Sequence, residues 1–546
     1  MQRTFLTTDV DRKRRELLLT LAATSLGTAA LPGLVGAQAG SGDTAQKVLR
    51  TGHPGEPDSL DPHIAIAAPS LVVINDLFES LLTLDSHGRP IAGAAERYSV
   101  SPDGRVYTFT LRQGLRFSDG RPIDSADFLY SFRRLADPRT ASTALAAWID
   151  LIEGGRAVVR GQQPVTTLGV AAPDPRTVQI KLVVPAPYFP SIAAFPVFAP
   201  MPRHVIDQHG RNWTRPEYFV SNGPYVLDQW RPGQMVRAKR NPRFHAAASV
   251  KIDAIEYRPI IDLNAGLRMF QTGALDALTN FPPERLEWLR QNMPRELRLS
   301  PSLGITVYVI NHRLPKFADP RVRRALSLAI DRDVITTRIV RAGDTPAWGI
   351  VPSGMSGYAP ALKPPLGSQA ERTALARRLL SDAGRGPSNP LEIELLYHTS
   401  EEHKKVAIAV AAMWQAIGVR ATLRNAERQV VEVATRNGEF EIVRAAWFSP
   451  YADPMGYLGF LRRGSPQNGG AYDSAAYETA VDAAQVLTDP AARGRALRVA
   501  EQRLVDEQAV IPIYFLVSRR LISQRVVGWN DDSLTALRPV RWLDLR

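Results

Sequence analysis

The segment EEHKKVAIAVAAMWQAIG, residues 401–418, has the apolar spacing of an amphipathic helix. Gly418 is its predicted end, since glycine readily adopts the left-handed conformation that stops a helix. The residues predicted to be buried are Val406, Val410, Met413 and Trp414. Two predicted strands follow, VRATLR at 419–424 and FEIVRAAW at 440–447. This succession of helix and strands predicts an α/β lobe.

Segments on either side of this region extend the pattern. DPRVRRALSLAIDRDVI (319–335) is a second predicted helix, and its Asp-Pro pair is a start signal. Its predicted apolar stripe is Val322, Ala325, Leu326 and Ala329. VYTFTL (106–111) alternates as a strand does, and the turn before it predicts antiparallel pairing. Its predicted inward face is Tyr107, Phe109 and Leu111. Proline-rich stretches at 184–202 and 351–365 indicate loops or crossings between lobes.

Length and composition restrict the class of protein. A chain of 546 residues is too long for one core, so two or more lobes are expected. Apolar content of 45% and charged content of 22% are those of a soluble globular protein. The net charge of +13 comes from 67 basic and 54 acidic residues, but arginine is spread along the whole chain. We therefore expect a solvated basic surface and no nucleic-acid partner.

The N-terminus has the three parts of an export signal. A basic region, Arg12–Arg15, precedes an apolar stretch, Leu17–Val35, and the small-x-small site Ala37-Gln38-Ala39. The Arg14-Arg15 pair resembles a twin-arginine signal, and an ordinary secretory signal with a basic head is the alternative. We expect a periplasmic protein that begins near Gly40. No other window has the roughly 20 apolar residues of a membrane span, so the exported chain is expected to be soluble.

Catalytic and metal-binding motifs are missing from the sequence. Cysteine is absent, which excludes a thiol nucleophile, a disulfide framework, cysteine-bound zinc and a lipid-anchored N-terminal cysteine. No G-x-S-x-G, phosphate loop, G-x-G-x-x-G or H-E-x-x-H is present, and the nine histidines are scattered. We expect no enzyme activity, cofactor or metal. A glycosidase-like carboxylate pair stays open, because such pairs need no local motif.

The order of several segments resembles the extracytoplasmic oligopeptide- and dipeptide-binding proteins of ABC importers (family 5). The segment with the most recognisable similarity is YTFTLRQGLRFSDGRPIDSADFLYSFRRLADPRTAS (107–142). Other matching segments are EPDSLDPHIA (56–65), NDLFESLLTLD (75–85), VPAPYF (184–189), SNGPYVLDQW (221–230), the helix at 319–335, LLYHTSEEHKKVAIAVAAMW (395–414) and AVIPIYFLVSRRL (509–521). They cover essentially the whole mature chain in order, and the oligopeptide-binding branch is the most similar.

The resemblance implies an α/β, periplasmic-binding-protein-like fold, with two main lobes closing on a ligand plus an additional inserted lobe. After the export signal at 1–39, the first lobe is expected from three segments, 40–78, 201–303 and 517–546. The inserted lobe is expected at 79–200, and the third lobe at 304–516. We expect a monomer.

The resemblance also implies which residues hold a peptide. The ligand backbone is expected to pair along Gly304-Ile305 and along Ala445-Ala446-Trp447, as a guest strand does. The cations that match the family's carboxylate anchors are Arg341, His403, Arg436 and Arg444. The alternative for each arginine is a surface charge, and His403 has the alternative of a purely structural role at a helix end. Trp447 is expected to be a pocket wall, with core packing as the alternative.

Three positions depart from the family pattern. Pro450 stands where the family has an Asp that pairs with the ligand's amino group, whereas Tyr451, Asp453 and Pro454 keep the rest of that pattern. Gln429 replaces a family Trp and Leu516 a family Tyr. Proline offers no charge and no N–H, so a free amino terminus should not be required. Either the ligand lacks that group, or Asp453 replaces the missing acid; otherwise Asp453 only caps the turn before Pro454.

Together these features predict a periplasmic binding protein that captures oligopeptides and delivers them to the membrane subunits of an ABC permease. A peptide derivative or another acidic solute without a free amino terminus is the alternative ligand. An exported hydrolase that uses a cleft carboxylate is the remote alternative.

Overall fold

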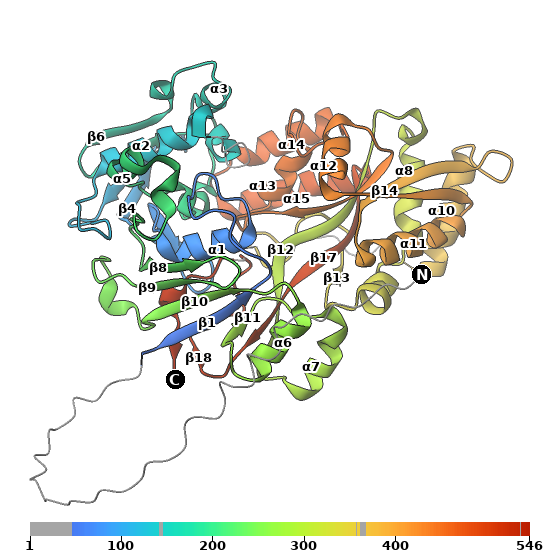
Figure 1. Ribbon diagram of the computed structural model, residues 1–546. Helices are drawn as coiled ribbons and strands as arrows, with labels where there is room; N and C mark the ends of the chain where they lie inside the picture. Colours follow the sequence, from blue (N-terminus) through green and yellow to red (C-terminus); the bar gives the residue numbers. More distant parts are fainter. Residues whose placement is uncertain (1–45, 141–145, 356, 361–366, 536) are drawn as a thin grey trace, which may run out of the picture. The chain divides into compact units, whose positions relative to one another are not determined.

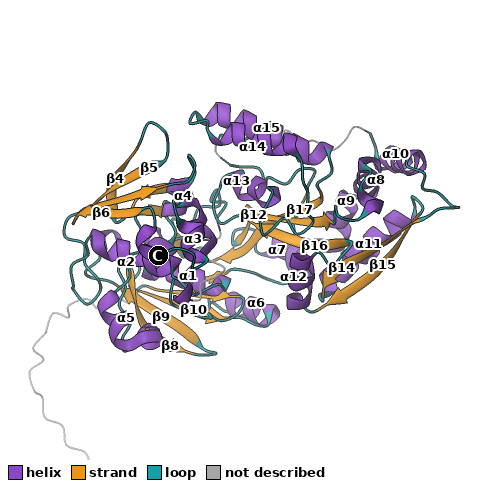
Figure 2. Ribbon diagram, turned by 90° about the horizontal axis from the view of Figure 1, so that it is seen from above, coloured by secondary structure: helices purple, strands orange, loops and turns teal. Residues whose placement is uncertain are grey.

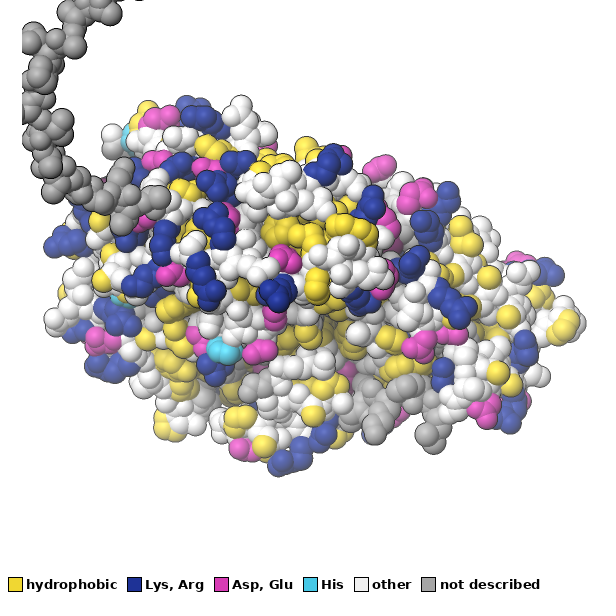
Figure 3. All heavy atoms as spheres, turned by 90° about the horizontal axis from the view of Figure 1, so that it is seen from below, with side chains coloured by type: hydrophobic (Ala, Val, Ile, Leu, Met, Phe, Trp, Pro, Cys, Tyr) yellow, Lys and Arg dark blue, Asp and Glu magenta, His cyan; other side chains and the backbone are white. Residues whose placement is uncertain are grey.

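The computed structural model describes residues 46–140, 146–355, 357–360, 367–535 and 537–546. These residues form a mixed α/β structure (Figures 1 and 2). The predicted export signal at 1–39 lies outside the described residues. Within the described ranges, no helix is long and apolar enough to cross a membrane. Figure 3 shows one face of the molecule, where Lys and Arg side chains are scattered among acidic and apolar ones.

The largest element is an eleven-stranded mixed sheet. Ten of its strands follow in the order β15 (Val419–Ala426), β14 (Leu391–His398), β16 (Ile442–Phe448), β12 (Leu297–Ile310), β17 (Val510–Ile522), β11 (Ala277–Leu278), β1 (Val48–His53), β10 (Ala254–Pro259), β9 (Met235–Arg240) and β8 (Tyr225–Arg231). β13 (Thr345–Pro346) pairs with β17 beside this path. The long strands β12 and β17 are antiparallel neighbours, while β1 is parallel to both β10 and β11 (Figure 1).

A second, four-stranded sheet confirms the strand predicted at 106–111. It has the order β4 (Ala95–Val100), β5 (Val106–Leu111), β7 (Thr177–Lys181) and β6 (Val170–Asp174), and all of its pairs are antiparallel. Tyr107, Phe109 and Leu111 are all buried, as the alternation predicts. Two antiparallel pairs complete the strands: β2 (Leu82–Leu84) with β3 (Pro90–Ala92), and β18 (Val526–Val527) with β19 (Asp544–Leu545).

Fifteen α-helices lie within the described residues. They are α1 (Ala68–Leu77), α2 (Ser125–Ala136), α3 (Gly155–Val159), α4 (Phe189–Ala193), α5 (Arg203–His209), α6 (Leu263–Gln271), α7 (Leu286–Asn292), α8 (Pro320–Ala329), α9 (Arg332–Val334), α10 (Gln369–Asp382), α11 (Glu401–Gln415), α12 (Arg428–Asn437), α13 (Met455–Leu458), α14 (Ala475–Gln485) and α15 (Pro490–Asp506). In Figure 2, α14 lies beside α15 and α8 beside α10.

α11 follows the predicted helix closely. Val406, Val410 and Trp414 are buried, Met413 is half-buried, and Gly418 has the left-handed φ of 86°. Its first turn carries carboxylates, among them Glu402. Negative charges at this end stabilise the helix, because the N-terminus is the positive end of the helix dipole. Glu402 and His403 both lie in this first turn.

The helix predicted at 319–335 is shorter than expected. α8 starts after Asp319, whose side chain accepts the Arg321 N–H, and its stripe Val322, Ala325, Leu326 and Ala329 is buried. The chain leaves helical geometry at Ile330, and Asp331 then caps the short α9. The break allows the buried Arg332 guanidinium to donate to carbonyls of α8 and of the neighbouring strands. A tertiary contact of this kind leaves no mark in the local sequence period.

The two sheets lie in different parts of the predicted lobe arrangement. All four strands of the smaller sheet fall within 79–200, while the large sheet combines strands from the segments assigned to the first and third lobes. The division into lobes with the stated boundaries stays a prediction.

Candidate ligand-binding cavity

A cavity of about 380 Å³ lies on one face of the large sheet. Opposite residues of paired strands share a face, as do alternate residues of one strand. The register of β17, β11 and β1 therefore places one row of residues on the cavity floor. These floor residues are Leu49, Thr51, His53, Ala277, Thr279, Leu516, Ser518 and Arg520.

The walls come from segments far apart in the sequence. The start of α1 contributes Ala68, Pro69 and Val72, and the C-terminal segment contributes Trp529, Arg538, Val540 and Leu543. Phe448 at the end of β16, Ser302, Asp344 and Glu402 close the remaining side. Apolar walls with a few charged groups are typical of a ligand site.

Phe448 and Leu516 meet over Gly304. A Cβ atom at Gly304 would lie 2.7 Å from Phe448 Cε1 and 2.8 Å from Leu516 Cδ1, so glycine is what lets these two side chains approach the strand. Gly304 pairs with Phe448, and Ile305 pairs with both Trp447 and Phe515. At Ile305, β12 therefore has a strand on each side.

β16 has a free edge beside the cavity. It pairs with β12 along its whole length, but with β14 only through Ile442 and Val443. Among the described residues, Arg444–Phe448 thus have a strand partner on one side only. This segment contains the predicted pairing residues Ala445, Ala446 and Trp447, so of the two predicted strands β16 offers the open edge for a guest chain.

Arg444 lies on that edge without an ion pair in the described part of the chain. Its side chain is half-buried, and Nη2 donates to the Thr306 hydroxyl at 3.3 Å. Thr306 pairs with Tyr514, whose hydroxyl lies 3.5 Å from a Glu402 carboxylate oxygen. Arg444 is therefore connected through polar groups to the cavity wall.

His403 is neutral at neutral pH. Burial, followed by the positive charges of Arg444 and of His398 when that histidine is protonated, lowers its pKa to about 4. Its Nδ1 lies 3.3 Å from the His398 carbonyl, and the two rings are 4.1 Å apart. Arg444 is thus the permanent cation at this place, and His403 is a neutral neighbour.

Arg341 and Arg436 are exposed. Arg341 follows the π-helix Ile335–Val340 and has a left-handed φ of 53°. Arg436 lies in the last turn of α12, which buries Val431 and Ala434. Neither arginine lines the cavity, and their role as carboxylate anchors stays a prediction.

Trp447 lies in the core. Its ring is 7% exposed and packs edge-on against Phe460, with centroids 5.6 Å apart. The next residue, Phe448, points to the other face, is 59% exposed and forms the cavity wall. The predicted strand ended one residue too early, and the alternation of Arg444, Ala446 and Phe448 was the signal that could have identified Phe448.

Pro450 is exposed in the turn after β16. The turn is tied to β12 by the Ser449 N–H, which donates to the Leu303 carbonyl at 3.1 Å. Asp453, the acid considered as a replacement, accepts two hydrogen bonds from Arg493 at 2.7 and 2.9 Å and one from the Met455 N–H at 2.9 Å. Its carboxylate is already paired, which supports the capping alternative.

Two carboxylates in the cavity wall were not anticipated. The Asp344 carboxylate accepts the Val517 N–H at 2.9 Å, and burial, with a further contribution from Glu402, raises its pKa to about 6. The second carboxylate is Glu402. Asp344 and Glu402 come close because β13 and α11 both reach strand β17, and no local sequence motif marks this arrangement. The residues that the resemblance assigns to backbone pairing or to carboxylate anchoring are not among the described residues that line the cavity itself; the cavity adjoins them through Phe448, Leu516 and Glu402.

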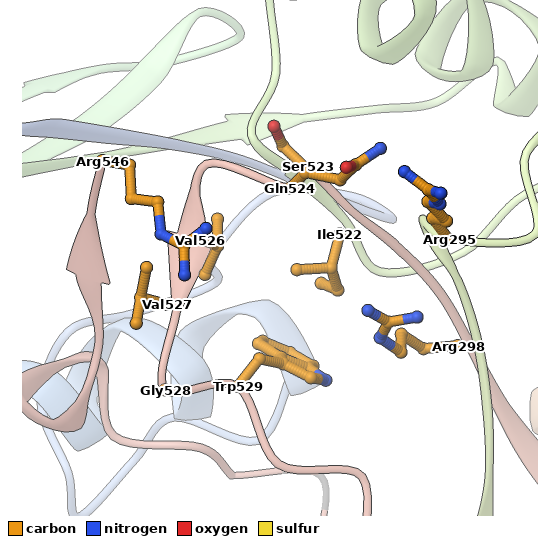
Figure 4. Close-up of a pocket in the computed structure, with 10 residues that line it drawn as sticks. All are labelled: Arg295, Arg298, Ile522, Ser523, Gln524, Val526, Val527, Gly528, Trp529 and Arg546. Carbon is orange, nitrogen blue, oxygen red and sulfur yellow. The ribbon is translucent and has the colours of Figure 1, made fainter.

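A second hollow, of about 540 Å³, lies along the C-terminal segment (Figure 4). Three arginines line it, Arg295, Arg298 and Arg546, together with Trp529, which also borders the cavity. Arg298 is paired with Asp531 at 3.4 Å. Ile522, Val526 and Val527 also line this hollow, so it combines apolar and basic side chains.

Comparisons with known proteins agree with this architecture. Residues 89–469 match the family model described as bacterial extracellular solute-binding proteins, family 5 Middle. The chain is 35% identical over 520 residues to the periplasmic oligopeptide-binding protein OppA of Salmonella typhimurium, with 94% of each chain covered. It is 34% identical over 490 residues to the probable deoxycholate-binding periplasmic protein YgiS of Escherichia coli, covering 89% of this chain and 91% of that protein.

A solved structure shows the same fold. The Escherichia coli murein tripeptide binding protein MppA matches with a TM-score of 0.79 and 32% identity, over 92% of this chain and 99% of that one. The predicted fold class, mixed α/β of the periplasmic-binding-protein type, is confirmed, and so is a binding protein in place of an enzyme. The chain belongs to the bacterial extracellular solute-binding proteins of family 5.

Proposed function

We propose that this protein captures an oligopeptide or peptide-like ligand in the cavity and delivers it to the membrane subunits of an ABC importer. The observation that carries the proposal is the edge of β16 beside the cavity, where neither a second strand nor an acidic partner of Arg444 occurs among the described residues. OppA and MppA are named as peptide-binding proteins, and YgiS as a probable deoxycholate-binding one, so peptides are the favoured ligand class.

The edge of β16 supplies hydrogen bonds that suit any peptide backbone. A guest strand beside Ala445–Trp447 would pair with main-chain groups and leave its side chains to the cavity. Such pairing is indifferent to sequence, which suits a carrier of many peptides. The two main lobes, in the predicted division, would close over the ligand because some contacts form only when both touch it.

The ligand carboxylate is assigned to Arg444. A buried carboxylate needs a cation, and the planar guanidinium can bind both of its oxygens. His403 would add a hydrogen bond, and a carboxylate nearby would raise its lowered pKa. Arg436 and Arg341, being exposed, would serve longer or differently placed ligands.

Delivery through an importer requires a location outside the cytoplasmic membrane. The relatives OppA and YgiS are periplasmic by name, and we propose the same location for this chain. The export route can be tested by replacing both Arg14 and Arg15 with Lys and measuring the protein in the periplasmic fraction. This change blocks the twin-arginine route, whereas the ordinary secretory route would still export the protein.

Incubation of the purified protein with a peptide library tests the function. We expect mass spectrometry to recover bound peptides with their chain lengths unchanged. A competition arm with deoxycholate distinguishes the alternative solute. Shortened peptides would indicate a hydrolase, and retention of deoxycholate without any peptide would contradict the peptide assignment.

Pro450→Asp is expected to shift ligand preference toward a free amino terminus by about 1.5–3 kcal/mol, the strength of a hydrogen bond to a charged group. The native protein should bind an N-acetylated peptide at least as well as its free-amine form, because Pro450 offers neither charge nor N–H. Isothermal titration with both peptides measures the shift.

Pro450→Asn is the matched control, since it has the size of Asp without the charge. It should leave the preference of the native protein unchanged. A native protein that strongly prefers the free amine would contradict the expectation, and loss of that preference in Glu402→Gln would assign the amine to the cavity wall.

A further inference from the structure

Arg520 on the cavity floor is a buried cation without an acidic partner in the described part of the chain. Its side chain is only 7% exposed, and no hydrogen bond or ion pair reaches it from the described residues. Its guanidinium lies 5.5 Å from the centre of the Trp529 ring, and the Arg538 guanidinium lies 4.9 Å from the same ring. Arg520, Trp529 and Arg538 all line the cavity, so the unpaired charge borders the space that a ligand would fill.

The groups around Arg520 do not neutralise it. Arg538 is also cationic, and its hydrogen bonds go to the carbonyls of Asn530 and Ser533 and, at 3.5 Å, to the Ser300 hydroxyl. Asp531, an acid close enough to affect Arg520, is paired with Arg298. Burial, followed by the charge of Arg538, lowers the pKa of Arg520 to about 9, so the guanidinium remains charged at neutral pH.

His53 beside Arg520 is uncharged at neutral pH. Burial, followed by the charge of Arg520, lowers the pKa of His53 to about 4, and its Nε2 lies 3.0 Å from the Thr51 hydroxyl. A buried charge that lacks a counter-charge is costly, and an anion in the cavity would relieve that cost.

We propose that Arg520 and Arg538 form a subsite for a second negatively charged group of the ligand, the carboxylate of an acidic side chain. The Arg520 fork could bind both oxygens of such a carboxylate, while the Trp529 ring restricts where the fork lies. Thr279, Asn280 and Ser518 line the same cavity and offer further donors. The inference rests on the proposed function and narrows it to acidic peptides.

This subsite is separate from Arg444. The Thr306 hydroxyl that Arg444 contacts belongs to a residue paired with Tyr514, and Arg520 lies six residues further along β17. At about 3.3 Å per residue, the backbone positions of Tyr514 and Arg520 are roughly 20 Å apart. The long side chains shorten the gap, but one carboxylate could not bridge it. A ligand would therefore use the two cations with different groups.

The test uses three pairs of tripeptides with identical termini. The two peptides of a pair differ at one position, which is Glu in one peptide and Gln in the other. Each of the three pairs varies a different position. Isothermal titration with the native protein should show at least one pair whose Glu form binds at least tenfold more tightly. Arg520→Gln should remove that preference, whereas Arg520→Lys should keep part of it. Arg295→Gln, at an exposed arginine outside the cavity, is the matched control and should keep it whole.

Thermal denaturation without ligand provides a second readout. Arg520→Leu removes an unpaired buried charge, so its midpoint should equal or exceed that of the native protein. A lower midpoint together with an unchanged preference for Glu would show a structural role and overturn the proposal. Equal binding of both forms in every pair would overturn the subsite and leave peptide capture intact, whereas no binding of either form would contradict peptide capture itself.

Discussion

Arg444→Ala is expected to weaken binding of free-acid peptides by about 2–5 kcal/mol, the cost of removing one partner from a buried, hydrogen-bonded charge pair. The variant should fold normally, because the only hydrogen bond of the Arg444 side chain to the described residues is the one to Thr306. Isothermal titration of one peptide against native protein and variant measures the loss.

Three comparisons test whether Arg444 binds the carboxylate of the ligand. Arg444→Lys keeps the charge but loses the planar fork, so it should lie between native protein and Ala variant. The peptide amide should bind equally to native protein and Arg444→Ala, since it lacks the partner. Arg436→Ala should cost less than Arg444→Ala, because Arg436 is exposed and outside the cavity wall. Equal affinity of Arg444→Ala for the free acid would remove Arg444 from the site.

The local sequence pattern predicted those strands and helices in which buried residues recur at a regular spacing. Tyr107, Phe109 and Leu111 alternate on β5, and Val406, Val410 and Trp414 repeat on α11. These positions follow from two- and 3.6-residue periods, which the sequence displays directly. The family followed from the order of many segments, and the comparisons confirm it.

The cavity could not be predicted in the same way. Its floor joins His53, Thr279 and Arg520, which become neighbours only through the pairing of β1, β11 and β17. Each residue alone has an ordinary surface interpretation, and a chain with 67 basic residues offers many arginines that resemble Arg520. What distinguishes Arg520 is that no acidic partner lies beside it among the residues that the structure describes, and this is a property of the fold.

The predicted site residues illustrate the same limit. Resemblance identified Arg444 and the strand around it, but sequence alone could not decide which neighbours face the ligand. Trp447 and Phe448 are adjacent in the chain and point to opposite faces of β16. A strand prediction that ends one residue early therefore includes the core residue Trp447 and misses the cavity-wall residue Phe448.

Asp453→Ala is expected to lower the free energy of unfolding by about 3–5 kcal/mol, because it leaves Arg493 buried without a counter-charge. The two side chains are 13% and 8% exposed, and the guanidinium also lies 5.5 Å from the centre of the Tyr188 ring. Tyr188 in turn stacks on Tyr451, with ring centroids 5.2 Å apart. The pair thus holds the turn after β16 against a segment more than 250 residues earlier in the chain. Urea denaturation of ligand-free protein measures the loss.

The controls separate a charge left unpaired from a lost ligand contact. Asp473→Ala breaks the exposed pair with Arg463 and should change stability little, since solvent screens such pairs. The double variant Asp453→Ala/Arg493→Met should recover part of the loss, because it removes the stranded cation. Preference between free-amine and N-acetylated peptides should be unchanged in Asp453→Asn, as the carboxylate is occupied by Arg493 and the Met455 N–H. A stable Asp453→Ala that loses a free-amine preference would instead place this acid in the ligand site, and the turn after Pro450 would then have kept its amine anchor at a new position.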